Sequence, residues 1–332
     1  MKDGKLGVAM MGPGKIVRRV MRDFPNAANC ELIGMASRSP ERAKAAQEEY
    51  HAKYAFCYEE MLDCPEVDLV YIATPHNFHM QNAVLCMEHG KHVLCEKSFA
   101  VTEQEARTMV DCAKANGVFL MEAMWSRFFP ATYDLRRLLL EEKVIGEVRH
   151  IAAGMTFKVQ SDQGDGDRLY SKALAGGALL DLGIYPLSFC SMLLGPNPES
   201  VDSACRLAPT GVDERVVMQL QYPGGATAHL IGAFDCVEKN DAVIFGSEGR
   251  IEIPEYYHPT QFTVYSLKDG VKEYRYAPEY EGHHYQFQHA ADLIRTGVCD
   301  SPVMPLEETV KLVRLMQDIR HRNGIYYPGE TD

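Results

Sequence analysis

Short apolar runs alternate with amphipathic stretches through the first 123 residues. Runs rich in Val, Ile, Leu and Met predict buried strands at residues 5–11, 31–36, 67–73, 92–95 and 118–124. Apolar positions of helical period between them predict helices at residues 16–24, 40–50, 78–89 and 103–115. This alternation predicts an α/β domain, a doubly wound parallel sheet that binds ligands at the carboxyl ends of its strands.

The pattern changes after residue 123. Alternating apolar and polar positions at 146–159 and 201–276, interrupted by turn signals such as Asp269-Gly270, predict a large antiparallel sheet. Helical period predicts three accompanying helices at residues 177–194, 285–296 and 306–323. We therefore expect two domains, residues 1–123 and 124–332, the second an α+β domain on a mostly antiparallel open sheet. The boundary rests on the change of pattern alone.

Composition narrows the possible partners. The 332 residues are 46% hydrophobic and 24% charged, which is typical of a globular protein of two domains. The formal charge is 34 − 46 = −12 with the acids dispersed, so we expect no nucleic-acid partner. The sequence has no run near the ~20 apolar residues that span a bilayer, so we expect no membrane partner.

The cysteines and histidines do not predict a metal site. The ten cysteines are scattered without CxxC spacing, and His76, His79, His89 and His92 fall on a loop, a helix and a strand. We expect free thiols in a reducing, cytoplasmic compartment. We also expect His283 and His284 to occupy exposed capping positions at the start of a late helix, and the alternative is that they reach the ligand-binding cleft.

A glycine turn follows the first strand. Gly12 and Gly14 precede Lys15 and Ile16, which open the first helix. Glycines in this context allow a tight turn and let the backbone approach a pyrophosphate at the helix N-terminus. Val17 stands where the usual third glycine would be, and the alternative is a tight turn that binds nothing.

The end of the second strand bears on which dinucleotide binds. Ser37 and Arg38 stand where an NAD enzyme usually has an acidic residue, and Arg42 lies one helical turn further on. Guanidinium groups form paired, charge-assisted hydrogen bonds with phosphate. The sequence favours NADP over NAD, and the alternative is an ordinary solvated helix start.

Two further segments are candidates for proton transfer. Glu96-Lys97 follows a buried strand, and Asp181 and Tyr185 are four residues apart, so on a helix they share one face. A hydride-transfer enzyme needs a group that takes or gives the hydroxyl proton, and a tyrosine beside a lysine can do so. The alternatives are a surface lysine and a core tyrosine that hydrogen-bonds an aspartate.

The order of these motifs resembles the Gfo/Idh/MocA oxidoreductase family. The resemblance is carried by Gly12-x-Gly14, Thr74-Pro75-x-x-x-His79, Glu96-Lys97, Gly176-Gly177-x-x-x-Asp181-x-Gly183-x-Tyr185 and the segment from Phe245 to Pro254. The segment from Glu122 to Pro130, together with Tyr185, is similar to the dimeric dihydrodiol dehydrogenase and NADP-linked D-xylose dehydrogenase branch. Most other relatives have a histidine in place of this tyrosine.

The resemblance implies an N-terminal NAD(P)-binding Rossmann domain and a C-terminal domain for substrate binding and oligomerisation. It implies that Lys97 and Tyr185 form the catalytic pair with Asp181 beside them. The implied cofactor contacts are Gly12, Gly14, Lys15, Ile16, Ser37, Arg38, Arg42, Thr74, Pro75, His76, His79, Glu96 and Lys97. The implied substrate contacts are Trp125, Arg127, Phe157 and Tyr185. The sheet of the second domain would form a homodimer or homotetramer.

One position departs from the family motif Glu-Lys-Pro, because Ser98 replaces the proline. A cis bond before a residue other than proline costs about 2.5–4 kcal/mol, so we expect Lys97–Ser98 to be trans.

Taken together, the motifs and the resemblance predict an NADP-dependent oxidoreductase that acts on a sugar-like or cyclic diol substrate. Two alternatives stay open: a non-catalytic NADP(H)-binding regulator, which Ser98 favours, and a carbonyl reductase working in the opposite direction.

Overall fold

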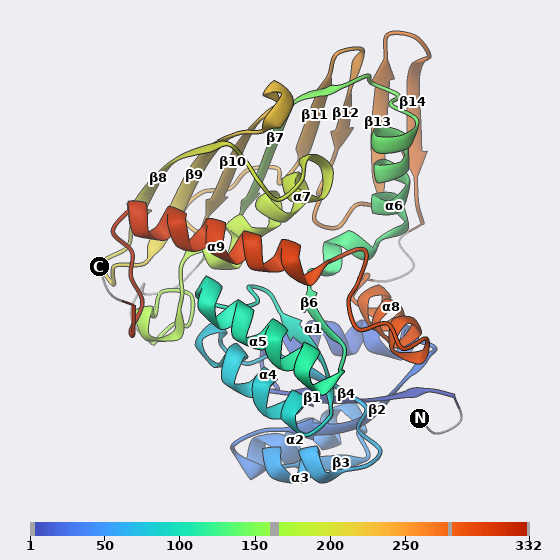
Figure 1. Cartoon of the computed structure of the whole chain (residues 1–332), viewed down its shortest axis with the longest axis vertical. Helices are drawn as coiled ribbons and strands as arrows, with labels where there is room; N and C mark the ends of the chain where they lie inside the picture. Colours follow the sequence, from blue (N-terminus) through green and yellow to red (C-terminus); the bar gives the residue numbers. More distant parts are fainter. Residues whose placement is uncertain (1–3, 160–165, 278–280, 331–332) are drawn as a thin grey trace. The chain divides into compact units, whose positions relative to one another are not determined.

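The chain forms two compact units. The computed structural model describes residues 4–159, 166–277 and 281–330 (Figure 1). The first unit comprises Met1–Trp125 and Glu279–Val310, and the second comprises Ser126–Pro278 and Lys311–Asp332. The change of pattern predicted two continuous domains. It did not predict that the chain returns to the first unit after passing through the second.

A parallel sheet forms the centre of the first unit. In the described part of the chain its strands are β1 (Leu6–Met11), β2 (Cys30–Ala36), β3 (Tyr54–Phe56), β4 (Leu69–Ile72), β5 (His92–Glu96) and β6 (Leu120–Ala123). Their order is β3-β2-β1-β4-β5-β6, and every pair is parallel. The strand order reverses beside β1, which is where such folds bind nucleotides. The predicted doubly wound sheet is confirmed; β3, with three residues, was too short to show a pattern.

Helices connect these strands. They are α1 (Lys15–Asp23), α2 (Pro40–Tyr50), α3 (Tyr58–Asp63), α4 (His79–Glu88) and α5 (Glu103–Asn116). Helices α4 and α5 lie side by side (Figure 1). The hydroxyls of Ser39 and Thr102 cap the N-termini of α2 and α5, and Gly117 ends α5 in a left-handed conformation.

The last helix of the first unit is α8 (His284–Arg295). The ring of Phe287 packs at 5.0 Å from Phe24 and 5.2 Å from Tyr71. Asp23 accepts hydrogen bonds from the backbone N–H and from Nδ1 of His284, each at 2.9 Å. These aromatic and polar contacts fix α8 on the Rossmann sheet.

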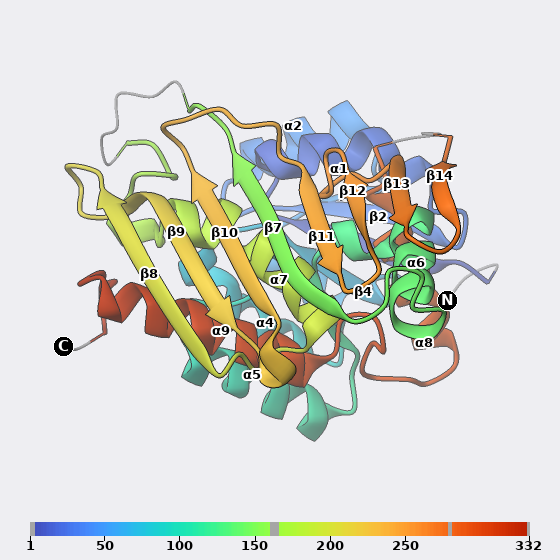
Figure 2. The ribbon, with the colours of Figure 1, turned by 90° about the horizontal axis from the view of Figure 1, so that it is seen from above.

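The second unit contains a large mixed sheet. Its strands in the described residues are β7 (Val148–Thr156), β8 (Ser200–Leu207), β9 (Asp213–Gln221), β10 (Thr227–Ala233), β11 (Ala242–Gly246), β12 (Gly249–Ile253), β13 (Gln261–Ser266) and β14 (Gly270–Arg275). Their order is β14-β13-β12-β11-β7-β10-β9-β8, and Figure 2 shows this sheet face-on. The pairing is antiparallel except between β7 and β10. The predicted mostly antiparallel sheet is confirmed.

Helices cover one face of this sheet. Helix α6 (Pro130–Arg136) continues into a π-helical turn, Arg137–Glu141, and a second π-helical turn, Leu179–Gly183, leads into α7 (Ile184–Leu194). Helix α9 (Leu306–Arg322) belongs to the second unit from Lys311 onward. Along β9, Val216, Met218 and Leu220 are buried while Val217 is exposed, so the two faces of the strand differ in polarity and burial.

In contrast to the expectation that no run approaches the length of a membrane span, one helical stretch among the described residues, Lys172–Leu194, has that length and composition. Most of its apolar window, 89%, is buried within the protein. Such burial is typical of the core helix of a folded domain.

Candidate active site

The glycine turn after β1 leaves the N-terminus of α1 open. Gly12 has φ +89°, and a Cβ there would lie 3.0 Å from Cγ2 of Thr74 and 3.1 Å from the carbonyl oxygen of Ala73. Gly14 is the N-cap of α1 and has no side chain to bond the first N–H groups. The nearest atom to a Cβ on Gly14 would be 3.8 Å away. The first turn of α1, which begins with Lys15 and Ile16, can therefore accept an anion such as a pyrophosphate.

Cationic side chains surround this turn on the β2 side. Ser37 is buried, and its Oγ accepts a hydrogen bond from the backbone N–H of Ser39 at 3.2 Å. The guanidinium of Arg38 lies 5.0 Å from the ring centre of Phe78. Arg42 donates to the carbonyl oxygen of Pro13 at 3.3 Å and, with Pro13 and Gly14, lines a pocket. These side chains can donate hydrogen bonds to an anionic group, and no carboxylate follows directly after β2.

The predicted residues after β4 are tied together by a buried histidine. His79 is fully buried, with Nε2 at 2.8 Å from the carbonyl oxygen of Thr74 and Nδ1 at 3.0 Å from that of Ser98. His76 is also buried, and its ring lies edge-on to His79 at 5.6 Å. His79 thus connects the turn that begins at Thr74-Pro75 to the segment that follows Lys97.

Glu96 and Lys97 occupy the carboxyl end of β5. Glu96 is buried, accepts a hydrogen bond from the hydroxyl of Tyr71, and accepts another from the backbone N–H of Lys97 at 3.2 Å. Lys97 is half-buried. β5 and β4 are neighbours in the sheet, so Lys97 and Thr74 follow adjacent strands. The structure therefore brings the predicted cofactor residues of the first unit to one edge of the sheet.

The expectation of a trans Lys97–Ser98 bond was wrong, because the bond is cis. That expectation used only the intrinsic preference of a bond before serine. In the structure Ser98 is fully buried and its carbonyl oxygen faces His79, while the backbone N–H of Phe99 donates to Oε1 of Glu122 at 3.1 Å. Tertiary contacts therefore hold the peptide group that directly follows this bond.

Glu122 was not identified from the sequence. It is a buried carboxylate on β6 whose Oε2 lies 3.3 Å from the Oγ1 of Thr309, and its other oxygen accepts from Phe99. A buried carboxylate is costly unless it is hydrogen-bonded, and here both of its oxygens accept hydrogen bonds. The available signal was a single acid within the apolar run 118–124.

The expected exposure of His283 and His284 was wrong, because both are buried. The ring of His283 stacks on that of Trp125 with centres 4.2 Å apart and an angle of 28°. His284 bonds Asp23 and, with the contacts of Phe287, anchors α8. One face of the predicted substrate residue Trp125 is therefore covered by an imidazole ring.

The second unit carries the predicted aspartate and tyrosine on a single helical segment. Asp181 lies in the π-helical turn Leu179–Gly183, and Tyr185 lies in the first turn of α7. Oδ1 of Asp181 is 3.0 Å from Nη2 of Arg168, which orients the carboxylate. Tyr185 is 7% exposed, so most of its ring is packed while a small part reaches solvent.

Arg127 anchors the turn before α6 to α7. Its guanidinium is buried and donates to Oγ of Ser188 at 2.8 Å and to the carbonyl oxygen of Ser188 at 2.7 Å. Ser188 lies three residues after Tyr185 on α7. In the described structure, Arg127 therefore contacts the helix that bears Tyr185.

An aromatic side chain that the sequence analysis did not identify connects two predicted residues. The ring centre of Tyr257 lies 6.4 Å from that of Tyr185 and 6.2 Å from that of Phe157. Phe157 follows β7 and is 43% exposed. The rings of Tyr185, Tyr257 and Phe157 are therefore neighbours, and Phe157 is the most exposed of the three.

No group of three or more His, Cys, Asp or Glu side chains is arranged to hold a metal ion in the residues that the structure describes. All ten cysteines are free thiols.

Two family models together match most of the chain. Residues 6–124 match the model described as "Oxidoreductase family, NAD-binding Rossmann fold", and residues 134–252 match "GFO/IDH/MocA C-terminal domain". Trans-1,2-dihydrobenzene-1,2-diol dehydrogenase of Mus musculus is 35% identical over 323 residues, covering 94% of each chain. The enzyme of the same name from Xenopus tropicalis is 32% identical and covers 91% of this chain and 92% of its own.

Solved structures agree with these matches. The aldose-aldose oxidoreductase of Caulobacter crescentus, complexed with glycerol, superposes with a TM-score of 0.85 at 28% identity, covering 96% of this chain and 98% of its own. KijD10, a 3-ketoreductase from Actinomadura kijaniata in complex with NADP and TDP-benzene, also gives 0.85, at 26% identity and 96% and 97% coverage. This chain is an oxidoreductase with a dinucleotide-binding Rossmann domain, and it belongs to the Gfo/Idh/MocA family.

Proposed function

We propose that the protein is an NADP-dependent oxidoreductase that transfers a hydride between the nicotinamide and a CH–OH group of a sugar-like or cyclic diol substrate. The observation that carries the proposal is the pairing of an open, cation-flanked helix N-terminus with lysine and tyrosine at the family's motif positions. The names of the relatives describe a cyclic diol dehydrogenase and an aldose oxidoreductase, which agrees with this substrate class.

The residues of the first unit would hold the cofactor. The backbone at Gly12, Gly14 and the first turn of α1 would bind the pyrophosphate, as the missing N-cap side chain allows. Arg38 and Arg42 would bind the 2′-phosphate that NADP carries and NAD lacks, with Ser37 as a hydroxyl donor. The turn at Thr74–His76 and the buried Glu96, supported by His79, would line the nicotinamide end. When bound, NADP supplies the hydride acceptor, or in reduced form the hydride donor.

The protein's own groups would move the proton. During oxidation, Tyr185 would accept the hydroxyl proton of the substrate while the carbinol C–H electron pair leaves as hydride. The ammonium group of Lys97 would favour the phenolate form of Tyr185 through its positive charge. Asp181, oriented by Arg168, would bind the reacting end of the substrate through its carboxylate.

The remaining predicted residues would select the substrate. Trp125, with one face against His283, and Phe157, which is half exposed, offer apolar ring faces to a cyclic molecule. Arg127 donates to Ser188 on α7, so we propose that it fixes this helix as well as contributing to the substrate side.

A reductase working in the opposite direction is a second candidate. The structural similarity to a 3-ketoreductase favours it, and the same residues would serve, with Tyr185 giving its proton to the carbonyl oxygen.

We further propose a homodimer or homotetramer assembled through the mixed sheet, where Val217 and Phe245 are exposed. The free cysteines agree with a cytoplasmic protein.

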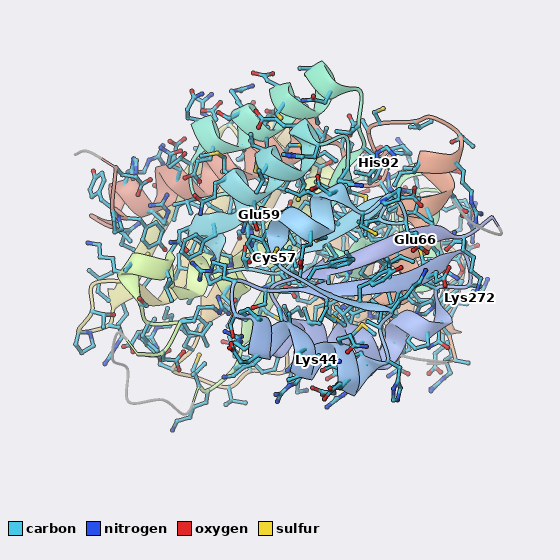
Figure 3. All side chains as sticks on the ribbon, turned by 90° about the horizontal axis from the view of Figure 1, so that it is seen from below. Lys44, Cys57, Glu59, Glu66, His92 and Lys272 are labelled. Carbon is cyan, nitrogen blue, oxygen red and sulfur yellow. The ribbon has the colours of Figure 1, made fainter. Side chains whose placement is uncertain are left out.

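Lys97→Met tests the proposal. We expect turnover of the best substrate in a panel of aldoses and cyclic diols with NADP⁺ to fall by about 100-fold or more. Without the positive charge of Lys97, Tyr185 would no longer be favoured as a phenolate, and proton transfer by a positioned group contributes that much. NADPH should still bind, because most of its proposed contacts do not involve Lys97. The matched control is Lys44→Met, on an exposed lysine of α2 whose side chain lies at the surface (Figure 3).

Two results would contradict the proposal. Unchanged turnover in Lys97→Met would remove Lys97 from the chemistry. Tight NADPH binding by the wild-type protein without turnover in either direction, across the whole panel, would favour the non-catalytic regulator.

A further inference from the structure

A buried charge pair lies at the C-terminal end of the second unit. Arg320, near the end of α9, is fully buried and donates from Nη1 and Nη2 to the two carboxylate oxygens of Glu330 at 2.8 and 2.9 Å. Nε2 of His321 lies 3.2 Å from the same carboxylate. Burial alone would raise the pKa of Glu330, but the hydrogen bond from Arg320 and the other contacts outweigh it and lower that pKa. The paired geometry folds the segment 325–330 back onto α9.

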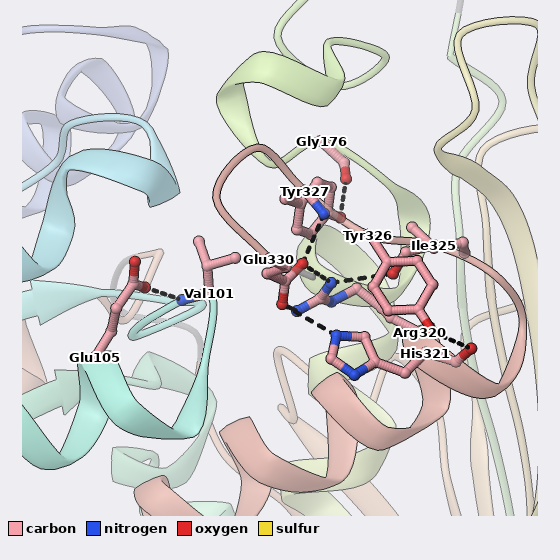
Figure 4. Close-up of polar contacts among 9 residues, drawn as sticks. All are labelled: Val101, Glu105, Gly176, Arg320, His321, Ile325, Tyr326, Tyr327 and Glu330. Carbon is pink, nitrogen blue, oxygen red and sulfur yellow. Dashed lines mark hydrogen bonds and ion pairs between the residues drawn. The ribbon is translucent and has the colours of Figure 1, made fainter. Parts of the chain in front are cut away.

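Tyr327 is fixed by both members of this pair. Its backbone N–H donates to Oε2 of Glu330 at 2.6 Å, and its ring lies 4.4 Å below the guanidinium of Arg320. The Tyr327 hydroxyl is buried and donates to the carbonyl oxygen of Gly176 (Figure 4). We call Arg320, Tyr327 and Glu330 the C-terminal clamp.

The clamp contacts the turn from which the Asp181 and Tyr185 segment begins. Gly177 has φ +121°, and a Cβ there would lie 2.3 Å from Oδ1 of Asp213 and 3.3 Å from the Tyr327 hydroxyl. Oδ2 of Asp213 accepts from the backbone N–H of Leu179 at 2.6 Å, and the N–H of Asp181 donates to the carbonyl oxygen of Gly177 at 3.2 Å. The two glycines are therefore enclosed between Tyr327 and Asp213, and the next turn of backbone carries Asp181.

We propose that Tyr327, fixed by the buried Arg320–Glu330 pair, is a positioning residue that sets the orientation of the segment bearing Asp181 and Tyr185. This inference rests on the proposed function, in which these two side chains act on the substrate. The contact joins residues 151 positions apart in the sequence, so the end of the chain determines where the active-site turn lies. A misplacement of about 1 Å at a catalytic group can cost on the order of 100-fold in rate.

The chemistry of the clamp favours positioning over simple stabilisation. A buried ion pair is weak evidence for stability, because desolvating both charges offsets most of their attraction. The bidentate arginine–carboxylate contact has a fixed geometry, and here it fixes the direction of the Tyr327 hydroxyl. The Tyr327 hydroxyl donates to the carbonyl oxygen of Gly176, which lies at the start of the segment that bears the proposed acid–base residue.

Tyr327→Phe tests the inference, with Tyr326→Phe as the matched control. Tyr327→Phe keeps the ring below Arg320 and removes only the hydroxyl that bonds Gly176. Tyr326 stacks on His321, and its hydroxyl lies 3.5 Å from the His321 carbonyl, away from the glycine turn. We expect kcat to fall about 10-fold in Tyr327→Phe with NADPH affinity unchanged, and neither to change more than about two-fold in Tyr326→Phe.

Two further measurements separate positioning from folding. Hydrogen exchange at the amides of Leu179 and Asp181 should speed up in Tyr327→Phe and not in Tyr326→Phe. Glu330→Gln, which keeps the shape and removes the charge, should give a smaller loss of kcat in the same direction, and Glu330→Asp should restore part of it. Equal kcat and equal exchange in Tyr327→Phe and the wild type would overturn the inference.

The design also separates this inference from the proposed function. If the wild-type protein shows no turnover with any aldose or diol, the proposed function fails, and the exchange measurement alone decides whether the clamp orders the turn. Faster exchange at Leu179 in Tyr327→Phe would then support the clamp, and unchanged exchange would refute it.

Discussion

Replacing Asp213 by Asn should remove a measurable part of the protein's dependence of stability on pH. Asp213 is fully buried at the start of β9, and its Oδ2 accepts the N–H of Leu179 at 2.6 Å. Burial raises the pKa of this carboxyl from 3.8 to about 6, although backbone hydrogen bonds and Arg320 act in the opposite direction. An amide of the same shape cannot titrate, so the variant isolates this one group.

The sign and the size follow from linkage. The folded protein holds the Asp213 proton more tightly than the unfolded chain, so this stabilisation is complete below about pH 3.8 and is lost as pH rises through about 6. A shift of about two pKa units corresponds to roughly 3 kcal/mol, and about 1.4 kcal/mol of it falls between pH 7.5 and 5. The free energy of unfolding of Asp213→Asn, relative to wild type, should therefore be higher at pH 7.5 than at pH 5 by about 1.4 kcal/mol.

The assay must report the second unit by itself, because a two-unit protein need not unfold in one step. Native-state hydrogen exchange in urea at the buried amides of β9, Val216 and Met218, measures the opening free energy of this sheet. The comparison needs wild type and variant at both pH values. Equal differences between the two proteins at pH 7.5 and 5 would refute the raised pKa and the reasoning from burial.

Three further outcomes follow from the first unit. Arg38→Ala should weaken NADP⁺ binding about 10- to 100-fold and leave NAD⁺ binding unchanged, because a charged hydrogen bond contributes about 1.5–3 kcal/mol. Fluorescence titration measures both affinities, and equal losses for the two dinucleotides would contradict the phosphate contact. Gly12→Ala should lower the affinity for both dinucleotides at least about 10-fold, because the new Cβ would lie 3.0 Å from Thr74 and the backbone φ of +89° disfavours alanine. Full affinity would show that this turn does not bind the dinucleotide. His284→Phe should lower the free energy of unfolding of the first unit by about 2–3 kcal/mol, because it removes one hydrogen-bond donor from the buried carboxylate of Asp23. An unchanged midpoint of urea unfolding would contradict this expectation.

The sequence was sufficient for features whose signal is local. The glycines at 12 and 14 predicted an open helix N-terminus because their effect on the turn depends only on their own backbone. The apolar runs predicted where the longer strands lie along the chain for the same reason. Strand β3 was missed because Tyr54–Phe56 is shorter than the period that reveals a strand.

Features that depend on contacts across the fold could not be predicted in this way. The peptide group after the cis Lys97–Ser98 bond contacts His79 on α4 and Glu122 on β6, and local sequence does not show that these residues meet. His283 was expected at the surface because it stands at the start of a helix, whereas Trp125, 158 residues earlier, covers it. The membership of Glu279–Val310 in the first unit follows from the packing of Phe287, an aromatic residue whose partners cannot be read from periodicity.

Direct transfer of a labelled hydrogen tests the central claim most directly. The substrates would be D-xylose deuterated at C1 and trans-1,2-cyclohexanediol deuterated at both carbinol carbons, each incubated with NADP⁺ and the wild-type protein. The account predicts that mass spectrometry of the reduced cofactor finds one deuterium per molecule from the substrate that turns over. Reduced cofactor without deuterium, or no reduced cofactor from either compound or from the wider panel of aldoses and diols, would contradict it.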